Sequence, residues 1–387
     1  MLDVAASTES PKSAEQVQAI VAAAGAAGRR LEIIGGGTKR GISPVVASGV
    51  LSLAKLDKVI DYAPEELVLT VQAGARLAEL EKLVAAEGQM LPFEPPHLGK
   101  VLAARGKTTI GGAVAANLSG PRRIRAGAAR DHVLGFAGVT GRGEVFKAGG
   151  KVVKNVTGYD LSKLIAGSWG TLAVMTEITL KVLPAGRTET TLLFFGLDER
   201  RAGELMTLAM GTSAEVSGAA HLPAFAARRP PLKADLATTA LRLEGFPGSV
   251  TARAEALLLR LRGFGRAEAL DAAHSRDFWR HVRDVDVFAG DPRPLWRLSV
   301  PPAAGWQVAR QASGDALYDW AGGLVWMLSD APAAQVQAAA RALGGHAGCW
   351  RGGERAFAPL DPPLAALSGR VKAAFDPLGV LNPGKFG

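Results

Sequence analysis

The 387-residue sequence is long enough for two or three domains, and its 48% hydrophobic and 21% charged residues exclude a disordered chain. A single cysteine, Cys349, excludes internal disulfides and an iron–sulfur cluster or zinc site held by cysteines of this chain alone. The net charge of +9 comes mostly from arginines without a nucleic-acid-binding motif, so we expect an acidic partner, an anionic ligand or a membrane headgroup surface and no nucleic acid.

The chain begins with a helix and a strand that lead into a glycine loop. Apolar spacing predicts a helix over Ser13–Ala27, capped by Ser13, and a buried strand over Leu31–Ile34. The loop 35–41 follows this strand as in a Rossmann fold, but Pro44 and β-branched residues stand where the fingerprint needs a helix. We therefore predict that the loop binds phosphate with its own amides; a glycine-rich turn without a ligand is the alternative.

A second glycine cluster lies further along the chain. Strands are predicted over Val50–Leu53, Val59–Tyr62 and Leu67–Gln72, and a helix over Leu77–Glu87. Thr108 or Thr109 then caps a helix that begins with glycines and alanines, so a flat ligand could approach its backbone closely. Close helix packing is the alternative explanation for these small residues.

A basic segment follows, and it has two interpretations. Its arginines are Arg122, Arg123, Arg125 and Arg130. Such a run is commonly a solvated loop, but it could also bind an anion or an acidic partner surface, and we predict contact with an acidic partner subunit. The next residues, Val133–Val139 and Val145–Lys147, predict a β-hairpin.

The stretch 150–184 contains the third glycine cluster. It predicts a short helix over Asp160–Ile165, a glycine turn, and a half-buried strand over Thr171–Val182. The small hydroxyls of the turn and strand would suit an anionic ligand that accepts hydrogen bonds. Three such clusters in one half of the chain suggest a large phosphate-bearing cofactor.

Beyond Pro184 the sequence predicts a second α+β domain with an antiparallel sheet. The predicted strands are Glu189–Leu197, Glu215–Ala219, Ala237–Leu243, Arg297–Val300 and Gly323–Leu328. The predicted helices are Asp198–Met210, Ser249–Leu261 and Ala333–Leu343. The tail, Arg370–Phe386, is predicted as a helix that ends in Pro- and Gly-rich turns.

Several of these segments together resemble the FAD-binding oxidases of the vanillyl-alcohol oxidase type. They are the loop GGGTKRG, the segment TIGG, the stretch KNVTGYDLSKLIAGSWGTLAVMTEITLKVLP and the tail FDPLGVLNPGKF. Within that superfamily, QMLPFEPPHLG, LSGPRRIRAG and RDHVLG resemble the FAD-binding E subunits of bacterial glycolate oxidase.

The resemblance implies an α+β fold that binds FAD non-covalently. It implies a PCMH-type FAD-binding domain over residues 1–184, with subdomains 1–52 and 53–184, an α+β cap domain over 185–369, and a tail over 370–387 that packs on the FAD-binding domain. The implied cofactor-binding residues are Gly35, Gly36, Gly37, Thr38, Lys39, Gly41, Thr109, Gly111, Gly112, Asn117, Gly167, Ser168, Gly170, Thr171 and Thr176.

The sequence also departs from related flavoprotein dehydrogenases. These carry paired histidines and a carboxylate in the cap that hold a metal and the substrate. Here only His274 and His281 stand at near-helical spacing, in a charged segment that predicts a solvated helix face, so we predict no metal site and assign no catalytic residue. The loop 35–41 has no histidine or cysteine for covalent flavin attachment, and His97 could serve only if the cofactor approached it.

The resemblance implies a FAD-binding subunit of a multi-subunit glycolate oxidase. The complex would oxidise a small 2-hydroxy acid, glycolate, to glyoxylate through a paralogous FAD-binding catalytic subunit and an iron–sulfur subunit. A stand-alone FAD-dependent 2-hydroxy-acid dehydrogenase or oxidase and a non-catalytic assembly subunit that retains the FAD fold are the alternatives. Without a secretory signal or a run of about 18 apolar residues, we expect a cytoplasmic protein that reaches the inner face of the membrane only through its partners.

Overall fold

The first sheet of the fold has three parallel strands in the order β1-β3-β2. The computed structural model describes residues 7–43, 45–150, 159–353 and 356–386. The elements of this part are β1 (Ser7–Glu9), α1 (Ala14–Ala26), β2 (Leu31–Ile34) and β3 (Gly49–Ser52). The Ser13 hydroxyl accepts from the Gln16 N–H at 3.3 Å, which confirms the predicted cap.

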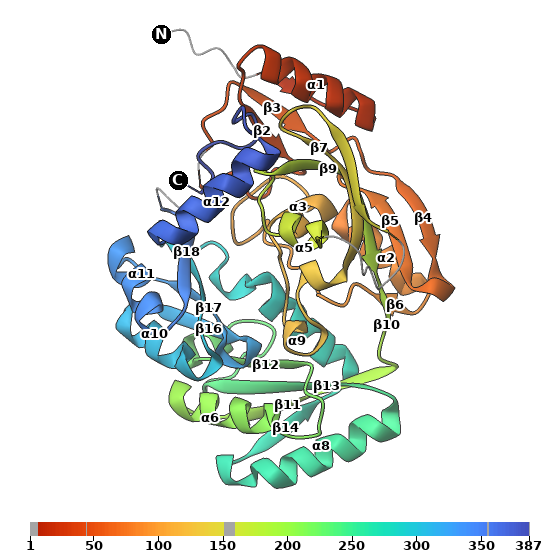
Figure 1. Cartoon of the computed structure of the whole chain (residues 1–387). Helices are drawn as coiled ribbons and strands as arrows, with labels where there is room; N and C mark the ends of the chain where they lie inside the picture. Colours follow the sequence, from red (N-terminus) through yellow and green to blue (C-terminus); the bar gives the residue numbers. More distant parts are fainter. Residues whose placement is uncertain (1–6, 44, 151–158, 354–355, 387) are drawn as a thin grey trace.

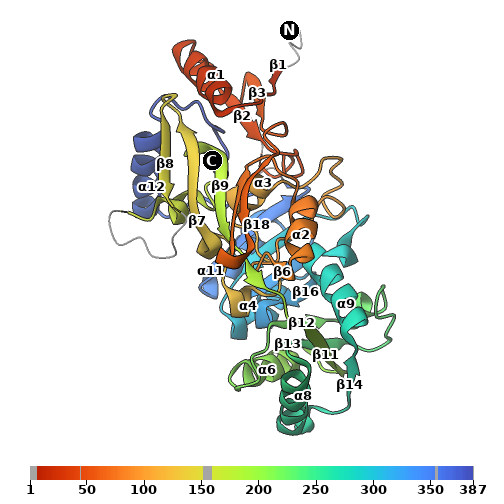
Figure 2. The ribbon, with the colours of Figure 1, turned by 90° about the vertical axis from the view of Figure 1, so that its right-hand side faces the viewer.

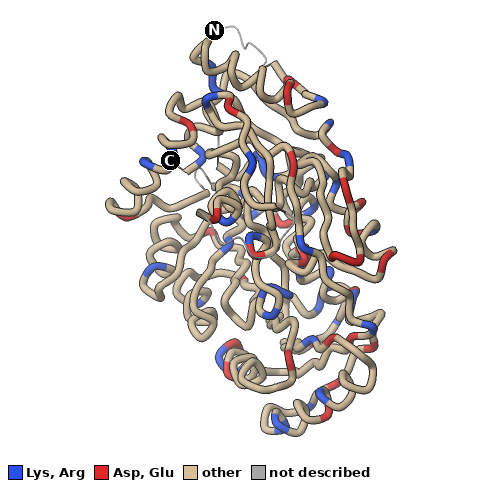
Figure 3. The backbone as a smooth tube through the Cα atoms, turned by 45° about the vertical axis from the view of Figure 1, so that its right-hand side comes forward, with Lys and Arg blue, Asp and Glu red and all other residues tan. Residues whose placement is uncertain are grey.

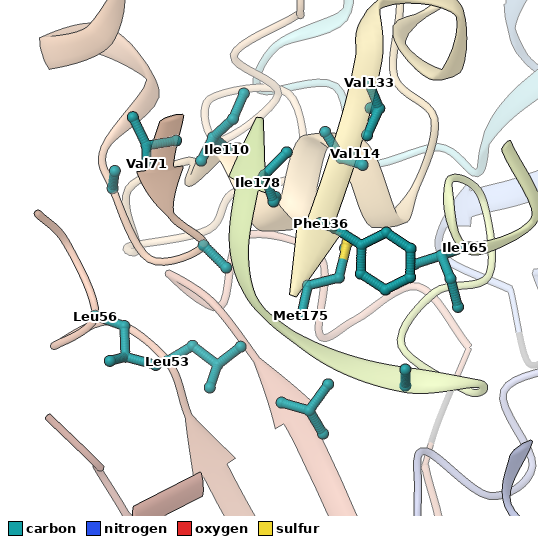
Figure 4. Packing of buried hydrophobic residues seen from close by; sticks show 14 of the residues in the cluster. Leu53, Leu56, Val71, Ile110, Val114, Val133, Phe136, Ile165, Met175 and Ile178 are labelled. Carbon is teal, nitrogen blue, oxygen red and sulfur yellow. The ribbon is translucent and has the colours of Figure 1, made fainter. Parts of the chain in front are cut away.

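The second sheet has five antiparallel strands in the order β4-β5-β9-β7-β8. Its strands are β4 (Val59–Ala63), β5 (Val68–Gln72), β7 (Val133–Thr140), β8 (Val145–Gly149) and β9 (Ala173–Lys181). The helices of this part are α2 (Leu77–Ala86), α3 (Ile110–Ala115), α4 (Arg123–Ala126) and α5 (Leu161–Ile165). Apolar side chains of β7, β9 and α3 form its core, as Figure 4 shows for Phe136, Ile178 and Val114.

A third sheet of eight strands makes up the C-terminal half, below the first two in Figure 1. Its order is β14-β11-β13-β12-β16-β17-β15-β18, and every pair is antiparallel, as predicted. The strands are β11 (Thr188–Phe195), β12 (Gly218–Leu222), β13 (Thr238–Gly245), β14 (Ala267–Leu270), β15 (Leu295–Ser299), β16 (Asp315–Asp319), β17 (Leu324–Leu328) and β18 (His346–Arg351). We propose to place the boundary between the halves near residue 184, where β10 (Leu183–Pro184) pairs with β6 (Gln89–Met90).

Helices cover one face of this large sheet. They are α6 (Glu199–Met210), α8 (Pro247–Leu261), α10 (Gly305–Gln311) and α11 (Ala333–Ala342), which lie on the side away from the N-terminal half (Figures 1 and 2). The other face packs on α9 (Ala272–Asp284) and on apolar residues of the N-terminal half, including Ile42 and Leu118. The large sheet therefore presents one face to the segment that carries the three glycine clusters.

Two predicted elements differ from the structure. The predicted strand Glu215–Ala219 begins only at Gly218, because Glu215 has a left-handed φ of 54° and lies in the preceding turn. The tail helix α12 is Pro362–Phe375, so it begins eight residues before the predicted Arg370. Its two prolines stand in the first turn, where a missing N–H costs no helical hydrogen bond.

After α12 the tail returns to the first sheet. The Leu31 N–H donates to the Val380 carbonyl at 2.8 Å, and the Asn382 N–H donates to the Leu31 carbonyl at 3.0 Å. Basic and acidic residues are interspersed over both halves (Figure 3). No helix in the four described ranges is long and apolar enough to cross a membrane.

Candidate cofactor site

The glycine loop after β2 lies directly against the segment that precedes α3. A Cβ atom on Gly36 would lie 1.7 Å from the Lys107 carbonyl oxygen, and one on Gly106 would lie 1.6 Å from the Gly36 carbonyl oxygen. A Cβ atom on Gly35 would lie 2.2 Å from Thr109 Oγ1. Contact between the two backbones therefore requires these glycines, and it brings the first two clusters together.

The second cluster is the start of α3. Thr109 caps this helix and its hydroxyl accepts from the Gly112 N–H at 3.3 Å. A Cβ atom on Gly111 would lie 2.6 Å from the Ala73 carbonyl oxygen, so packing explains this glycine without a ligand. Gly112 instead faces Lys39, whose Nζ would lie 3.5 Å from its Cβ. Asn117, just past the helix, has a left-handed φ of 46°.

The third cluster joins the other two through backbone hydrogen bonds. The N–H groups of Gly167 and Trp169 donate to the carbonyls of Val114 and Ala115 in α3, at 3.1 and 2.8 Å. Asn382 of the tail adds a bridge, because its Oδ1 accepts from the Ile33 N–H and its Nδ2 donates to the Trp169 carbonyl, both at 2.7 Å. All three glycine clusters therefore meet in one region.

Two lysines in this region have no acidic partner within ion-pair distance in the described part of the chain. Lys39 Nζ has only the Thr38 hydroxyl, at 3.4 Å. Burial and the positive charge of Lys385 lower the pKa of Lys39 to about 8, and burial lowers the pKa of Lys385 to about 8. Lys385 Nζ donates to the carbonyls of Ile42 and Ser43. Buried cations without an ion-pair partner among the described residues would be stabilised by a bound anion.

The hydroxyls of the third cluster fall into two groups. Ser168 Oγ is buried and has no hydrogen-bond partner within the described ranges. Thr171 Oγ1 donates to the Ser168 carbonyl at 2.7 Å, and Thr176 Oγ1 donates to the Ala137 carbonyl at 3.2 Å. An unpaired buried hydroxyl in the region of two lysines that have no ion-pair partner among the described residues fits a polar, anionic group such as the diphosphate of FAD.

The predicted partner surface is wrong at Arg122. Its side chain is only 17% exposed and forms ion pairs inside the chain, with Glu94 at 3.0 Å and with Glu244 at 2.5 Å. Arg125 is exposed and pairs with Glu215, and Arg130 is also exposed. A basic run in the sequence therefore contains one buried, fully paired arginine next to exposed ones.

His274 and His281 form hydrogen bonds on α9, whereas His97 lines a pocket together with Gly106, Lys107 and Thr108, directly before the second cluster. His274 is exposed near the start of α9, 2.8 Å from Asp271, and His281 donates to the Asp277 carbonyl at 2.9 Å. His97 lies 2.9 Å from the Glu81 carboxylate. Among the residues that the structure describes, no group of three or more His, Cys, Asp or Glu is arranged to hold a metal ion.

A group of side chains from the cap lies next to the third cluster and was not predicted as part of the site. Trp169 contacts Trp350 of β18, with ring centroids 5.7 Å apart, and Lys385 Nζ lies 5.2 Å from the Trp169 ring centroid. Trp350 in turn contacts Trp326 and Arg297. The clustering of tryptophans in residues 320–350 was the available signal.

Comparison with known proteins agrees with the geometry of this site. A family model described as a FAD binding domain matches residues 6–149. The glycolate oxidase subunit GlcE of Escherichia coli K12 is 37% identical over 363 residues, which are 92% of each chain. The glycolate oxidase subunit GlcD of Bacillus subtilis is 34% identical over 153 residues, which are 40% of this chain and 31% of GlcD.

The fold also resembles a solved structure of low sequence identity. The 4-ethylphenol oxidase of Gulosibacter chungangensis superimposes with a TM-score of 0.72 at 17% identity, over 98% of this chain and 88% of the oxidase. This likeness concerns the fold, and it includes both the glycine-cluster half and the cap.

Proposed function

Because the chain belongs to the family of the glycolate oxidase subunit GlcE and is a FAD-binding oxidoreductase, we propose that it works as one subunit of a complex. It serves as a FAD-binding subunit of a multi-subunit glycolate oxidase that converts glycolate to glyoxylate. The complex also contains a paralogous FAD-binding subunit and an iron–sulfur subunit that receives the electrons.

The observation that carries this proposal is a pair of lysines, without an ion-pair partner among the described residues, where the three glycine clusters meet. Lys39 and Lys385 would hold the FAD diphosphate, and Ser168 would donate its free hydroxyl to the same cofactor. Asn382 would keep the first and third clusters at a fixed separation. The chemistry that bound FAD would supply is to accept two electrons from a hydroxy acid and to release them one at a time.

The electron route must leave this chain to reach an iron–sulfur cluster. Such clusters are held mainly by several cysteine thiolates, and the sequence contains only Cys349. Cys349 is also buried, and burial raises the pKa of its thiol to about 11, which disfavours the thiolate form. The proposed cluster therefore belongs to a partner.

The test is reconstitution of the complex with defined variants of this subunit. All three subunits are co-expressed, and glycolate-dependent dye reduction and FAD content are measured with wild type, Lys39→Met and Lys58→Met; Lys58 is an exposed control. We expect Lys39→Met to lower both FAD content and activity and Lys58→Met to change neither. Full activity of a complex that lacks this subunit would contradict the proposal.

A further inference from the structure

Arg297 lies on the face of the cap sheet that is turned toward the N-terminal half. Along β15, Trp296 and Leu298 point into the helix-covered core, while Leu295 joins the core on the opposite face. Because side chains alternate along a strand, Arg297 shares the face of Leu295. Its neighbours across the ladder are Trp326 on β17 and Gly348 on β18.

Aromatic rings surround this arginine. Its Cζ lies 5.3 Å from the ring centroid of Trp320, 5.6 Å from that of Trp350 and 5.8 Å from that of Trp326. The three rings are buried, but Arg297 itself is half-buried. Cation–π contacts stabilise the guanidinium without using its N–H donors.

A second guanidinium lies on the same tryptophan. Arg123, from α4 of the N-terminal half, has its Cζ 4.1 Å from the Trp320 ring centroid. Burial and the charge of Arg123 lower the pKa of Arg297 to about 10. Burial raises the pKa of the adjacent Asp319 carboxyl to about 7, so this residue supplies only partial counter-charge near neutral pH.

Two neighbouring arginines at this boundary have guanidinium groups that are paired with carboxylates. Arg242 donates to both oxygens of Glu94, and Arg122 pairs with Glu94 and Glu244. Arg297 and Arg123, in contrast, have no side-chain hydrogen bond or ion pair in the described part of the chain. Two half-buried cations that contact aromatic rings, and whose guanidinium donors have no partner among the described residues, fit a small anion.

This arginine pair is continuous with the proposed cofactor site. Trp350 contacts Arg297 on one side and Trp169 of the third glycine cluster on the other. Trp169 in turn lies under Lys385. An anion bound to the arginines would therefore lie near the cofactor loops and at the boundary between the two halves.

We propose that Arg297 and Arg123 bind the carboxylate of a small 2-hydroxy acid or of its 2-oxo product. This inference rests on the proposed function, because it places the carboxylate beside the cofactor of an oxidoreductase. The planar guanidinium fork matches a carboxylate, which it binds with two parallel hydrogen bonds. The rings of Trp320, Trp326 and Trp350 pack around the Arg297 guanidinium.

The test measures binding of oxalate, a small carboxylate, to the purified chain by titration calorimetry and tryptophan fluorescence. Glycolamide, a neutral analogue of glycolate, is the ligand control. The variants are Arg297→Gln, Arg297→Lys and Arg123→Gln, and the matched control is Arg310→Gln at an exposed arginine on α10. Flavin absorbance of the same samples records FAD content.

We expect oxalate to bind wild type and Arg310→Gln equally and glycolamide to bind at least about tenfold more weakly. Loss of one charge-assisted interaction should weaken oxalate binding about tenfold or more in Arg297→Gln and in Arg123→Gln. If Arg297→Gln does not fold, Arg297→Lys and Arg123→Gln decide. Unchanged oxalate affinity in the folded variants, or no binding to FAD-loaded wild type, would overturn the inference. If the purified wild-type chain contained no FAD, this result would instead count against the proposed function.

Discussion

Arg242 of the cap donates two parallel hydrogen bonds to Glu94 of the N-terminal half, with Nη1–Oε1 at 3.0 Å and Nη2–Oε2 at 2.9 Å. The Arg242 side chain is 1% exposed and that of Glu94 is 9% exposed. Although burial raises the pKa of Glu94, Arg122 and Arg242 outweigh it and lower this pKa below its usual value. The pair is therefore charged and joins the two halves of the chain.

Removal of one partner should destabilise the chain strongly. Arg242→Met leaves Glu94 with only Arg122 as a counter-charge, and breaking a buried pair costs about 3–5 kcal/mol. Arg125→Met, which breaks the exposed pair with Glu215, should cost at most about 1 kcal/mol. Thermal unfolding measures both; equal melting temperatures in the two variants would contradict the assigned role.

Gly36→Ala should lose FAD although it adds no charge. The new methyl group would lie 1.7 Å from the Lys107 carbonyl oxygen, so the first two glycine clusters would move apart. Gly263→Ala is the control, because its Cβ meets no atom within 4 Å. Flavin absorbance per chain measures the effect. Normal FAD content in a folded Gly36→Ala protein would show that the loop contact is dispensable.

Ser168→Ala should weaken FAD binding without lowering the stability of the FAD-free chain. The hydroxyl has no partner among the residues that the structure describes, so its loss should leave the stability of the FAD-free chain unchanged or slightly higher. A lost hydrogen bond to FAD should weaken binding by about fivefold to tenfold. Ser119→Ala is the contrasting control, since Ser119 Oγ accepts from the Ala129 N–H at 2.9 Å and its loss should lower stability. An unchanged FAD dissociation constant in Ser168→Ala would remove this residue from the site.

FAD affinity should fall as the pH rises above about 8. Burial and Lys385 lower the pKa of Lys39 from 10.5 to about 8, whereas a bound diphosphate would favour the charged form and raise it. Below pH 8 the lysine is charged in both states, so affinity stays constant. Above it, binding requires proton uptake, and each titrating lysine weakens binding by up to about tenfold per pH unit.

The measurement is the FAD dissociation constant between pH 7 and 9 for wild type and Lys39→Met. The variant should bind more weakly at pH 7 and show a shallower slope, because only Lys385 still titrates. Parallel pH profiles for the two proteins would exclude Lys39 as the titrating group.

Local signals predicted much of the fold. The cap at Ser13 and the glycine at 28, with φ of 62°, define α1 within one residue. Strands rich in alternating apolar residues, such as β9, were also predicted. In contrast, β14 was missed because its sequence, AEAL, consists of helix-favouring residues, and β18 contains a glycine that weakens strand propensity.

Long-range pairing limited the prediction of the site. The partners of Arg122, Glu94 and Glu244, lie 28 and 122 positions away, so no local pattern distinguishes this buried arginine from its exposed neighbours. The glycine clusters were visible in the sequence. That Gly36 and Gly111 serve backbone contacts became clear only from their neighbours, Lys107 and Ala73.

The central claim is that the three glycine clusters hold one FAD without a covalent bond. The most direct measurement is the flavin content of the purified chain before and after acid precipitation. We expect one FAD per chain, all of it released into the supernatant. A colourless chain that takes up no FAD, or yellow colour that stays with the precipitate, would contradict the claim.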